Sequence, residues 1–416
     1  AHPGTDNQLV QYKISGYTDL AGNPGAELSG SSSLIADTKA PVITALAANF
    51  KSSGANPSYA KVGDEITLEF TTNEETQTPI VTFYKTATGS SSNFSNVLVT
   101  NPTADQKAWK ATYSVITGAV NGTVGCSISV DDLAGNNWFQ TGPAGVTIDT
   151  LLPEVSFESL MDTSLGANDW VKDSSTIRLK FSSDDITDAT LFPKVTFFVG
   201  DTLATATKLA EVQSVLLSTG SPRQYIADLL INNTTDNGLI FYKIHEIYDI
   251  AGNKGGDLSG PSTLKLDTTI PSILESSITF AREGAGDPNW ATKNNTIRLT
   301  FSSSEIITKP TVEFKYKNVP TSATVTPHAV DPTCWMATLV ISDQFDADTY
   351  GKEKISYEIS NITDRAGNVA PINHTGSKEL KLDTTAPTIT YITWRKGANG
   401  ADITTTNGST TVTITT

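Results

Sequence analysis

Short runs in which polar and apolar residues alternate recur along the chain. Three of them share one pattern: residues 65–70 read Glu-Ile-Thr-Leu-Glu-Phe, residues 176–181 read Thr-Ile-Arg-Leu-Lys-Phe, and residues 296–301 read Thr-Ile-Arg-Leu-Thr-Phe. A period of two is typical of a strand with one buried face. Further runs lie at residues 79–84, 108–116, 122–130 and 145–149, between clusters of Gly, Ser, Asn and Asp. Roughly seven short strands in about 110 residues predict an all-β chain of antiparallel β-sandwiches.

Two phrases repeat at a fixed distance and divide the chain. Asp-x-Ala-Gly-Asn starts at Asp19, Asp132, Asp249 and Asp364, at spacings of 113, 117 and 115 residues. Asp-Thr-x-x-Pro follows 17 to 19 residues later, at Asp37, Asp149, Asp267 and Asp383. This period is one small domain, longer than a solenoid unit. We predict complete repeats at 39–149, 150–267 and 268–383, the C-terminal part of a repeat at 1–38, and the N-terminal part of another at 384–416.

The predicted core contains one recurring aromatic residue. Trp109, Tyr225 and Trp335 occupy matching strand positions, and each is followed two residues later by Ala. Large aromatics at such positions fill the space between two sheets. Residues 208–218 alone could form a helix. We predict a strand there, because the segment occupies the place of residues 96–101 in the neighbouring repeat.

Composition excludes several classes of partner. The 416 residues carry 44 acidic and 29 basic side chains, a net charge of -15. This argues against nucleic acid and against anionic membranes, since both need clustered Lys and Arg. No run approaches the 18 apolar residues of a membrane span, and two cysteines about 200 residues apart do not make a disulfide framework. The start, Ala-His-Pro-Gly, leads us to expect a longer or processed chain.

Catalysis has little support in the sequence. The four histidines occupy unrelated repeat positions, and His245-Glu246 lacks the second histidine of a zinc-hydrolase helix. No nucleophile elbow, phosphate-binding glycine loop or reactive cysteine context appears. We therefore expect a protein that is not an enzyme.

Acidic residues gather at three places in each repeat. In a sandwich, the loop after the second strand and the loop before the last strand lie at the end where the chain enters. The linker adds a third segment. Together these segments bring carboxylate and amide oxygens to each junction, the ligand set of Ca²⁺. The candidate metal ligands are Asp37, Asp149, Asp267 and Asp383 in the linkers, Glu74, Glu75, Asp184, Asp185 and Glu305 after the second strand, and Asp132, Asn136, Asp249, Asn253, Asp364 and Asn368 in the repeated phrase.

A simpler explanation stands beside the metal sites. Asp, Asn and Gly are ordinary turn residues, which alone would account for Ala-Gly-Asn. They account less well for an acid that recurs both after the second strand and in the linker. Two carboxylates about 5 Å apart repel by roughly 3 kcal/mol at an effective dielectric of about 20, and a divalent cation removes that cost. Calcium fits better than magnesium, which demands tight octahedral geometry.

The phrases carry a resemblance. Asp-x-Ala-Gly-Asn followed by Asp-Thr-Thr-Ala-Pro-Thr-Ile, at residues 364–389, resembles the tandem bacterial immunoglobulin-like repeats of large surface adhesins and extracellular filament proteins. Residues 59–68, Tyr-Ala-Lys-Val-Gly-Asp-Glu-Ile-Thr-Leu, are similar to the second-strand region of such repeats. The resemblance implies tandem immunoglobulin-like sandwiches in an extended rod, secretion to the cell surface, and calcium between domains with Asp37, Asp149 and Asp267 as linker ligands.

The expected function is structural: the stalk of a surface adhesin or extracellular filament, stiffened by calcium at its junctions. Its partners would be the neighbouring repeats of the same longer chain, with other protomers or a host or surface ligand as further candidates. The alternative is a carbohydrate-binding or enzyme-accessory array. That function would need a planar row of exposed aromatics, and Trp138, the nearest candidate, has no counterpart in the other repeats.

Overall fold

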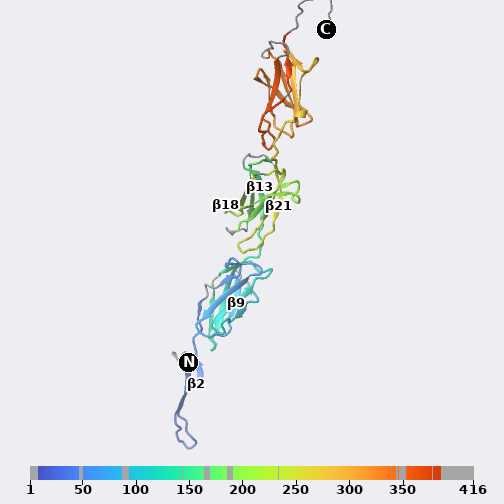
Figure 1. Ribbon diagram of the computed structural model, residues 1–416. Helices are drawn as coiled ribbons and strands as arrows, with labels where there is room; N and C mark the ends of the chain where they lie inside the picture. The colour runs from blue at the N-terminus through green and yellow to red at the C-terminus, as the bar shows by residue number, and fades with distance from the viewer. Residues whose placement is uncertain are drawn as a thin grey trace, which may run out of the picture. The chain divides into compact units, whose positions relative to one another are not determined.

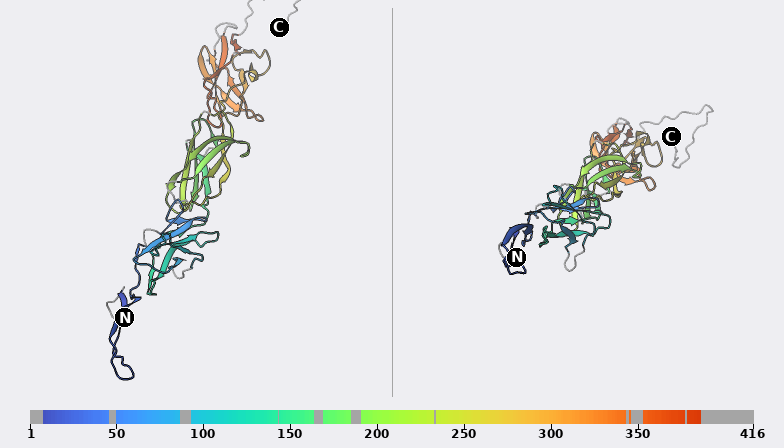
Figure 2. Two further views of the ribbon diagram at one scale, coloured as in Figure 1. Left: turned by 60° about the horizontal axis from the view of Figure 1, so that its bottom comes forward. Right: turned by 90° about the horizontal axis from the view of Figure 1, so that it is seen from below.

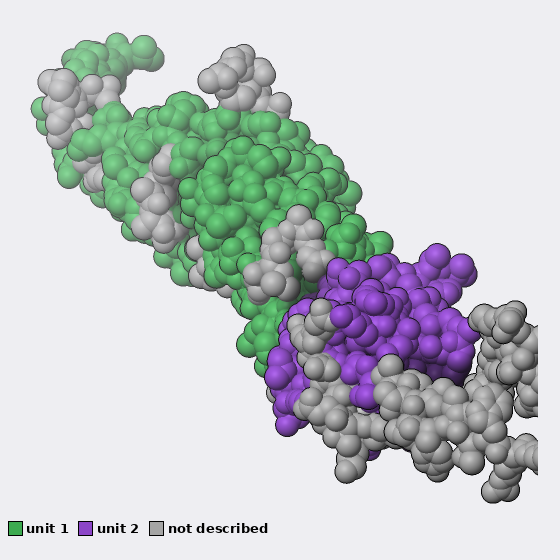
Figure 3. All heavy atoms as spheres, turned by 90° about the horizontal axis from the view of Figure 1, so that it is seen from above, with its two compact units in different colours: residues 1–268 green, residues 269–416 purple. Residues whose placement is uncertain are grey.

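The structure is a computed structural model. Its regular secondary structure is almost entirely β-strand. It describes residues 8–45, 50–86, 93–142, 144–163, 169–184, 191–232, 234–342, 345, 353–376 and 378–385. Two compact units divide the chain, Ala1–Thr268 and Thr269–Thr416 (Figure 3). Within the described residues the one helical element is a 3-10 turn, η1 (Glu275–Ser277), and no helix there is long and apolar enough to cross a membrane.

Unit 1 begins with an antiparallel hairpin. β1 (Gln8–Ile14) pairs with β2 (Leu28–Ala36), and Tyr12 lies opposite Gly30. The first Asp-x-Ala-Gly-Asn phrase lies in the loop between these two strands. Every residue of β1 is exposed.

The first sandwich of unit 1 has two sheets. One has the order β3-β6-β9-β8, with β4 also on β6; the other has the order β11-β10-β12-β5, with β7 on β10. All pairs are antiparallel except β5 with β12. The bounds are β3 (Ile43–Ala45), β4 (Phe50–Ser52), β5 (Tyr59–Ala60), β6 (Glu65–Thr72), β7 (Ile80–Lys85), β8 (Leu98–Thr100), β9 (Ala108–Ser114), β10 (Gly122–Asp131), β11 (Asn137–Thr141) and β12 (Val146–Ile148).

The second sandwich of unit 1 repeats this topology. Its sheets have the orders β13-β15-β19-β18 and β14-β21-β20-β16-β17 (Figure 1). β14 is parallel to β21. The bounds are β13 (Ser156–Asp162), β14 (Trp170–Val171), β15 (Thr176–Ser183), β16 (Lys194–Gly200), β17 (Thr207–Gln213), β18 (Val215–Ser218), β19 (Arg223–Leu230), β20 (Gly238–His245) and β21 (Leu258–Leu266).

Unit 2 contains a sandwich of the same kind. Its sheets have the orders β22-β24-β28-β27 and β23-β31-β29-β25-β26, with β30 also on β29. β23 is parallel to β31. The bounds are β22 (Thr279–Arg282), β23 (Trp290–Ala291), β24 (Thr296–Ser302), β25 (Thr311–Tyr316), β26 (Val319–Ser322), β27 (Thr324–Pro327), β28 (Cys334–Val340), β29 (Glu353–Ser360), β30 (His374–Thr375) and β31 (Leu380–Leu382).

These strand orders define the fold class. In each sandwich the first, second, fifth and fourth strands form one sheet, and the third, sixth and seventh form the other, as in immunoglobulin-like domains (Figures 1 and 2). In each sandwich the first strand passes from one sheet to the other. Its second part is the short strand β5, β14 or β23, which runs parallel to the last strand of the other sheet. The prediction of tandem immunoglobulin-like β-sandwiches is therefore confirmed.

The core follows the alternating pattern. In β15 the residues Ile177, Leu179 and Phe181 are fully buried, while the residues between them are partly exposed. The recurring aromatics Trp109, Tyr225 and Trp335 are buried, as predicted, and so are the alanines two residues after them. Residues 208–213 and 215–218 are strands, as predicted for this segment, and belong to β17 and β18 in opposite sheets. The predicted strand at 411–415 lies outside the described residues.

Candidate metal centres

Each Asp-x-Ala-Gly-Asn phrase folds into the same tight turn. In the second phrase the carboxylate of Asp132 accepts the backbone N–H of Asn136 at 2.8 Å and its side-chain amide N–H at 2.7 Å. Gly135 has φ = +94°, a conformation that a side chain would strain. The pairs Asp19–Asn23, Asp249–Asn253 and Asp364–Asn368 make the same two side-chain contacts, at 2.8 to 3.0 Å. The phrase is thus a turn signature in its own right, and its Asp and Asn have a structural role whether or not a cation binds.

The asparagine of the turn also reaches the linker. Asn136 Nδ2 donates to the backbone carbonyl of Asp37 at 3.2 Å, and Asn253 Nδ2 donates to that of Asp149 at 2.9 Å. Because the amide nitrogen is engaged in this way, only the amide oxygen can serve as a cation ligand. The turn therefore holds the incoming chain close to its own carboxylate.

Three carboxylates meet where the chain enters the first sandwich. Asp37, Glu74 and Asp132 each offer an oxygen, and these oxygens lie within 4.8 Å of one another. Asp132 is buried and the other two are half-buried. Each pair of such charges repels by about 3 kcal/mol at an effective dielectric of about 20. This cluster of hard oxygen ligands could hold a metal ion and would be stabilised by one.

Local contacts fix the acid after the second strand. The hydroxyl of Thr72, at the end of β6, donates to the backbone carbonyl of Glu74 at 2.7 Å. Asn73 accepts the backbone N–H of Val42 from the linker segment at 2.6 Å. In unit 2 Ser303 makes the corresponding contact to the carbonyl of Glu305. Ser304 Oγ in that loop also accepts the N–H of Ser272 at 3.0 Å, so the loop after the second strand is held against the entering chain in both places.

The electrostatics of Asp132 favour its charged form. Burial is the largest single effect and opposes ionisation, but the hydrogen bonds from Asn136, Gly135 and Ala134 together outweigh it and lower the pKa of Asp132. A charged carboxylate is thus held at the centre of the cluster. That is the protonation state that a metal ligand needs.

The second junction is built differently. Burial is the main cause that raises the pKa of Asp149; the backbone N–H of Leu151 opposes this shift and the negative charge of Asp249 adds to it. Asp184 is exposed, and its Oδ1 accepts the hydroxyl of Ser221 at 3.3 Å. Asp185 lies outside the described residues. In the described part of this junction two carboxylates, those of Asp149 and Asp249, therefore lie near each other, whereas the first junction has three.

In unit 2 the predicted ligands again come together. Glu305 and Asp364 offer carboxylate oxygens within 4.8 Å of each other. Asp364 is buried at the start of its turn, where it forms a bridge with Ile307. Asn368 is buried and bound to Asp364.

The remaining predicted ligands occupy other surroundings. Asp267, near the end of unit 1, is half-buried, and its N–H donates to the carbonyl of Val171. Asp383 is half-buried in unit 2, and its N–H donates to the carbonyl of Ala291. Glu75 is exposed beside Glu74.

Two functional residues escaped the sequence reasoning. Asn121 accepts the backbone N–H of Thr150 at 3.0 Å and its hydroxyl at 2.8 Å. Asn237 accepts the same two groups of Thr268 at 2.7 and 3.0 Å. Both asparagines directly precede a glycine that begins the sixth strand, at Gly122 and Gly238. This shared Asn-Gly pair was a signal that could have identified them.

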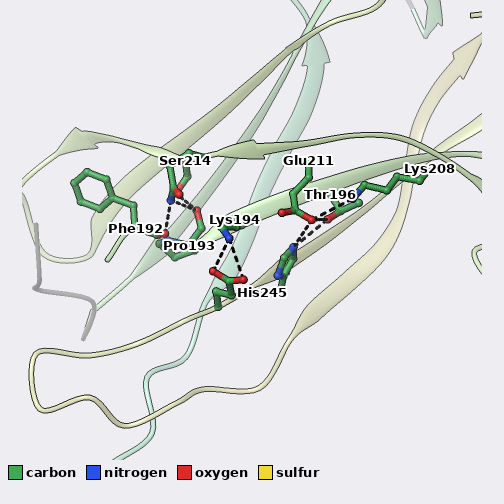
Figure 4. A network of polar contacts seen from close by, with 10 residues as sticks. Phe192, Pro193, Lys194, Thr196, Lys208, Glu211, Ser214 and His245 are labelled. Atoms are coloured by element: carbon green, nitrogen blue, oxygen red, sulfur yellow. Dashed lines mark hydrogen bonds and ion pairs between the residues drawn. The ribbon is translucent and has the colours of Figure 1, made fainter. Parts of the chain in front are cut away.

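A polar network on the second sandwich contains the histidine that the sequence analysis set aside. His245 Nε2 lies 2.9 Å from the hydroxyl of Thr196 and 3.8 Å from Glu211, which also pairs with Lys208 at 3.2 Å (Figure 4). Lys194 pairs separately with Glu246 at 2.9 Å. These neutralised pairs link β16, β17 and β20, and they hold the outer face of that sheet together.

Comparison with solved structures gives similarities of one kind. An adhesin described as Ca²⁺-stabilised, with which an Antarctic bacterium binds ice, is 16% identical over 90% of this chain and 81% of its own, with a TM-score of 0.40. A tetra-tandem repeat from the extending region of a large adhesion protein is 16% identical over the same shares, with a TM-score of 0.28. The D1–D4 ectodomain fragment of ICAM-5 is 12% identical over 80% of this chain and 77% of its own, with a TM-score of 0.27.

The three matched structures are two adhesin segments and an immunoglobulin-like ectodomain. With TM-scores below 0.5 they add nothing to the fold, which rests on the strand pairings. No protein-family model and no curated protein sequence matches the chain.

Proposed function

We propose that this chain is a non-enzymatic structural segment of a cell-surface adhesin or extracellular filament. Its repeats, 39–149, 150–267 and 268–383, are independent sandwiches joined by linkers of three or four residues. Linkers this short act as spacers rather than flexible tethers. Calcium at the junctions restricts bending between neighbours.

The acidic cluster of Asp37, Glu74 and Asp132 carries this proposal. Tight turns explain the Asp and Asn of the repeated phrase, but they do not require Glu74 to face two other carboxylates. The acid after the second strand comes from another part of the sandwich, and its backbone is held in place by Thr72. A cation explains why three charges of one sign converge in this way.

The test is thermal unfolding of the full chain in Ca²⁺ and in chelator. A site with a Kd of about 10⁻⁴ M gains roughly 2.7 kcal/mol in about 10 mM Ca²⁺, so the Tm should rise by several degrees. Glu74→Gln should remove one bound calcium in a titration. Glu75→Gln, the exposed neighbour, is the matched control and should leave the stoichiometry unchanged. Equal melting curves in the two solutions, or equal effects of the two variants, would favour turns without a cation.

A second function, carbohydrate binding, has one observation in its favour. A cavity of about 490 Å³ in unit 2 is lined by Trp290, Arg282, Asp287, Asn295 and Asp383, among others. An aromatic ring with hydrogen-bonding side chains around it is a setting in which a sugar could bind. Glycan-array binding that is lost with Trp290→Ala would support this function, whereas calcium-dependent melting alone would not.

A further inference from the structure

One peptide group of the linker is hydrogen-bonded on both of its sides. The carbonyl of Asp149 accepts Nδ2 of Asn253 at 2.9 Å. The N–H of Thr150, which belongs to the same peptide group, donates to Oδ1 of Asn121 at 3.0 Å, and the Thr150 hydroxyl donates to that oxygen at 2.8 Å. Asn121 directly precedes β10 of the first sandwich, and Asn253 ends the turn before β21 of the second. Residues of two successive sandwiches thus hold one peptide bond.

Both halves of this arrangement recur elsewhere in unit 1. Asn136 donates to the carbonyl of Asp37 at 3.2 Å, which is the contact from the following sandwich. Asn237 accepts the N–H and hydroxyl of Thr268, which are the contacts from the preceding sandwich. The recurring Asp-Thr pair in the linker therefore has a specific use: Asp supplies a carbonyl beside the turn, and Thr supplies two donors to an asparagine.

We propose that Asn121, Thr150 and Asn253 form a clamp that restricts the linker without a metal ion. The clamp rests on the proposed stalk function and adds to it a second source of stiffness. All its contacts are hydrogen bonds between neutral groups, so its strength does not depend on calcium. Loss of one contact of this kind raises the population of an open linker by about 2- to 13-fold.

The two asparagines have opposite chemical roles, which makes the clamp testable. Asn121 acts only as an acceptor, so an Asp at that position can still accept both donors of Thr150. Asn253 acts as a donor toward Asp149, a role that Asp cannot fill when ionised. Asn121→Asp should therefore preserve its half of the clamp, while Asn121→Ala and Asn253→Ala should each break one half.

The experiment uses the full chain in chelator. Spin labels attached through Leu98→Cys and Leu217→Cys, at two exposed positions, report the distance between the two sandwiches of unit 1. Cys334 is replaced by Ser; Cys126 stays, because its thiol is buried with a pKa of about 11. Hydrogen exchange at the amide of Thr150 gives a second readout.

We expect a narrow distance distribution in the parent and in Asn121→Asp. Asn121→Ala and Asn253→Ala should broaden it, and Asn121→Ala should speed the exchange of the Thr150 amide by at least about fivefold. Asn237→Ala is the matched control: Asn237 binds Thr268 of the next linker, and its loss should leave this distribution unchanged.

The outcomes separate the clamp from calcium. A parent that is broad in chelator and narrow in Ca²⁺ would overturn the clamp and leave the calcium junction standing. A parent that is narrow in both solutions, with alanine variants that broaden in chelator, would support the clamp. If those variants are equally broad in Ca²⁺, calcium does not stiffen this junction; if Ca²⁺ narrows them again, both restraints act there. Alanine variants as narrow as the parent, with unchanged Thr150 exchange, would also overturn the clamp, as would Asn121→Asp behaving like Asn121→Ala.

Discussion

At the scale of single residues, two aspartates from successive junctions, Asp132 of the turn phrase and Asp149 of the linker phrase, differ in how their charge is supported. Asp132 is stabilised as an anion by hydrogen bonds from its own turn, and its pKa is lowered. Asp149 is partly buried beside Asp249, and its pKa is raised. A raised carboxylate pKa contributes stability below the unfolded value, near 3.9, and that contribution is lost as pH rises through the folded value. At neutral pH the ionised Asp149 therefore destabilises the folded state unless a cation is bound.

The first residue-scale prediction is that Asp149→Asn has opposite effects in chelator and in calcium. Asn keeps an oxygen for the N–H of Leu151, which donates to Asp149 at 3.1 Å, but carries no charge. In chelator at neutral pH the variant should melt about 1 to 2 °C above the parent. In Ca²⁺ it should melt below the parent, because a linker ligand is lost. The measurement is thermal unfolding at several pH values.

Acidification provides the control for this prediction. As pH falls toward the unfolded pKa, Asp149 becomes protonated in the parent, and the advantage of the variant in chelator should disappear. A variant that is less stable than the parent in chelator at neutral pH would contradict the electrostatic argument.

Sequence reasoning at this scale identified charges better than hydrogen-bond partners. The repeated phrase pointed to Asp132 and the acidic position after the second strand pointed to Glu74, and the structure brings both to one cluster. Asn121 was missed because its partner, Thr150, lies 29 residues away across the linker. Successive strands run in opposite directions, so the end of the sandwich at which a carboxylate lies can be predicted from the strand that it follows. The hydrogen-bond partner of a neutral amide depends on the geometry of the loops, which the strand pattern does not determine.

At the scale of elements, alternation predicted the strands that form the centre of each sheet. β6, β15 and β24 bury every second residue, so their sequence pattern was unambiguous. The two-residue parallel strands, such as β14, were not predicted, because a strand so short has no periodicity. The division of residues 207–218 between opposite sheets was missed for a related reason: one residue separates β17 from β18.

A tyrosine–glycine pair links the sixth and seventh strands. Tyr242 lies opposite Gly260, and Tyr12 lies opposite Gly30. In unit 2 a Cβ added at Gly376 would lie 1.5 Å from the Tyr357 hydroxyl. The ring of Tyr357 is buried, so it cannot move into solvent. Glycine is required there because the ring covers its backbone.

The element-scale prediction is that Gly376→Ala destabilises unit 2. The methyl group must displace Tyr357 or the backbone at position 376, which follows β30, and overpacking of this kind costs about 1 to 3 kcal/mol. Gly256→Ala is the control, since nothing lies within 4 Å of a Cβ at that position. It should stay within about 0.5 kcal/mol of the parent in urea unfolding. Equal effects of the two substitutions would show that the ring does not set the requirement for glycine.

At the scale of the whole molecule, the period of the two phrases indicated one sandwich per repeat. The chain divides into two compact units after Thr268, and the boundaries of the repeats, at residues 149, 267 and 383, stay a prediction. Spacing alone carried that inference, because a linker phrase must recur wherever a domain ends. How successive domains are angled depends on a few contacts at each linker, which no periodicity encodes.

The last prediction concerns the shape of the chain in solution. Strands of about ten residues at roughly 3.3 Å each make a sandwich about 35 Å long, so three sandwiches joined end to end should exceed about 100 Å. A compact globule of the same 416 residues would have a radius of gyration of about 22 Å and a maximum dimension near 60 Å. Small-angle scattering in Ca²⁺ should therefore give a maximum dimension above about 100 Å. In chelator the Asn121→Ala, Asn253→Ala double variant should give a broader distribution of long distances than the parent, because both the cation and the clamp are then absent from that junction. A maximum dimension near 60 Å in Ca²⁺ would contradict the stalk, since sandwiches folded back on one another cannot serve as a spacer.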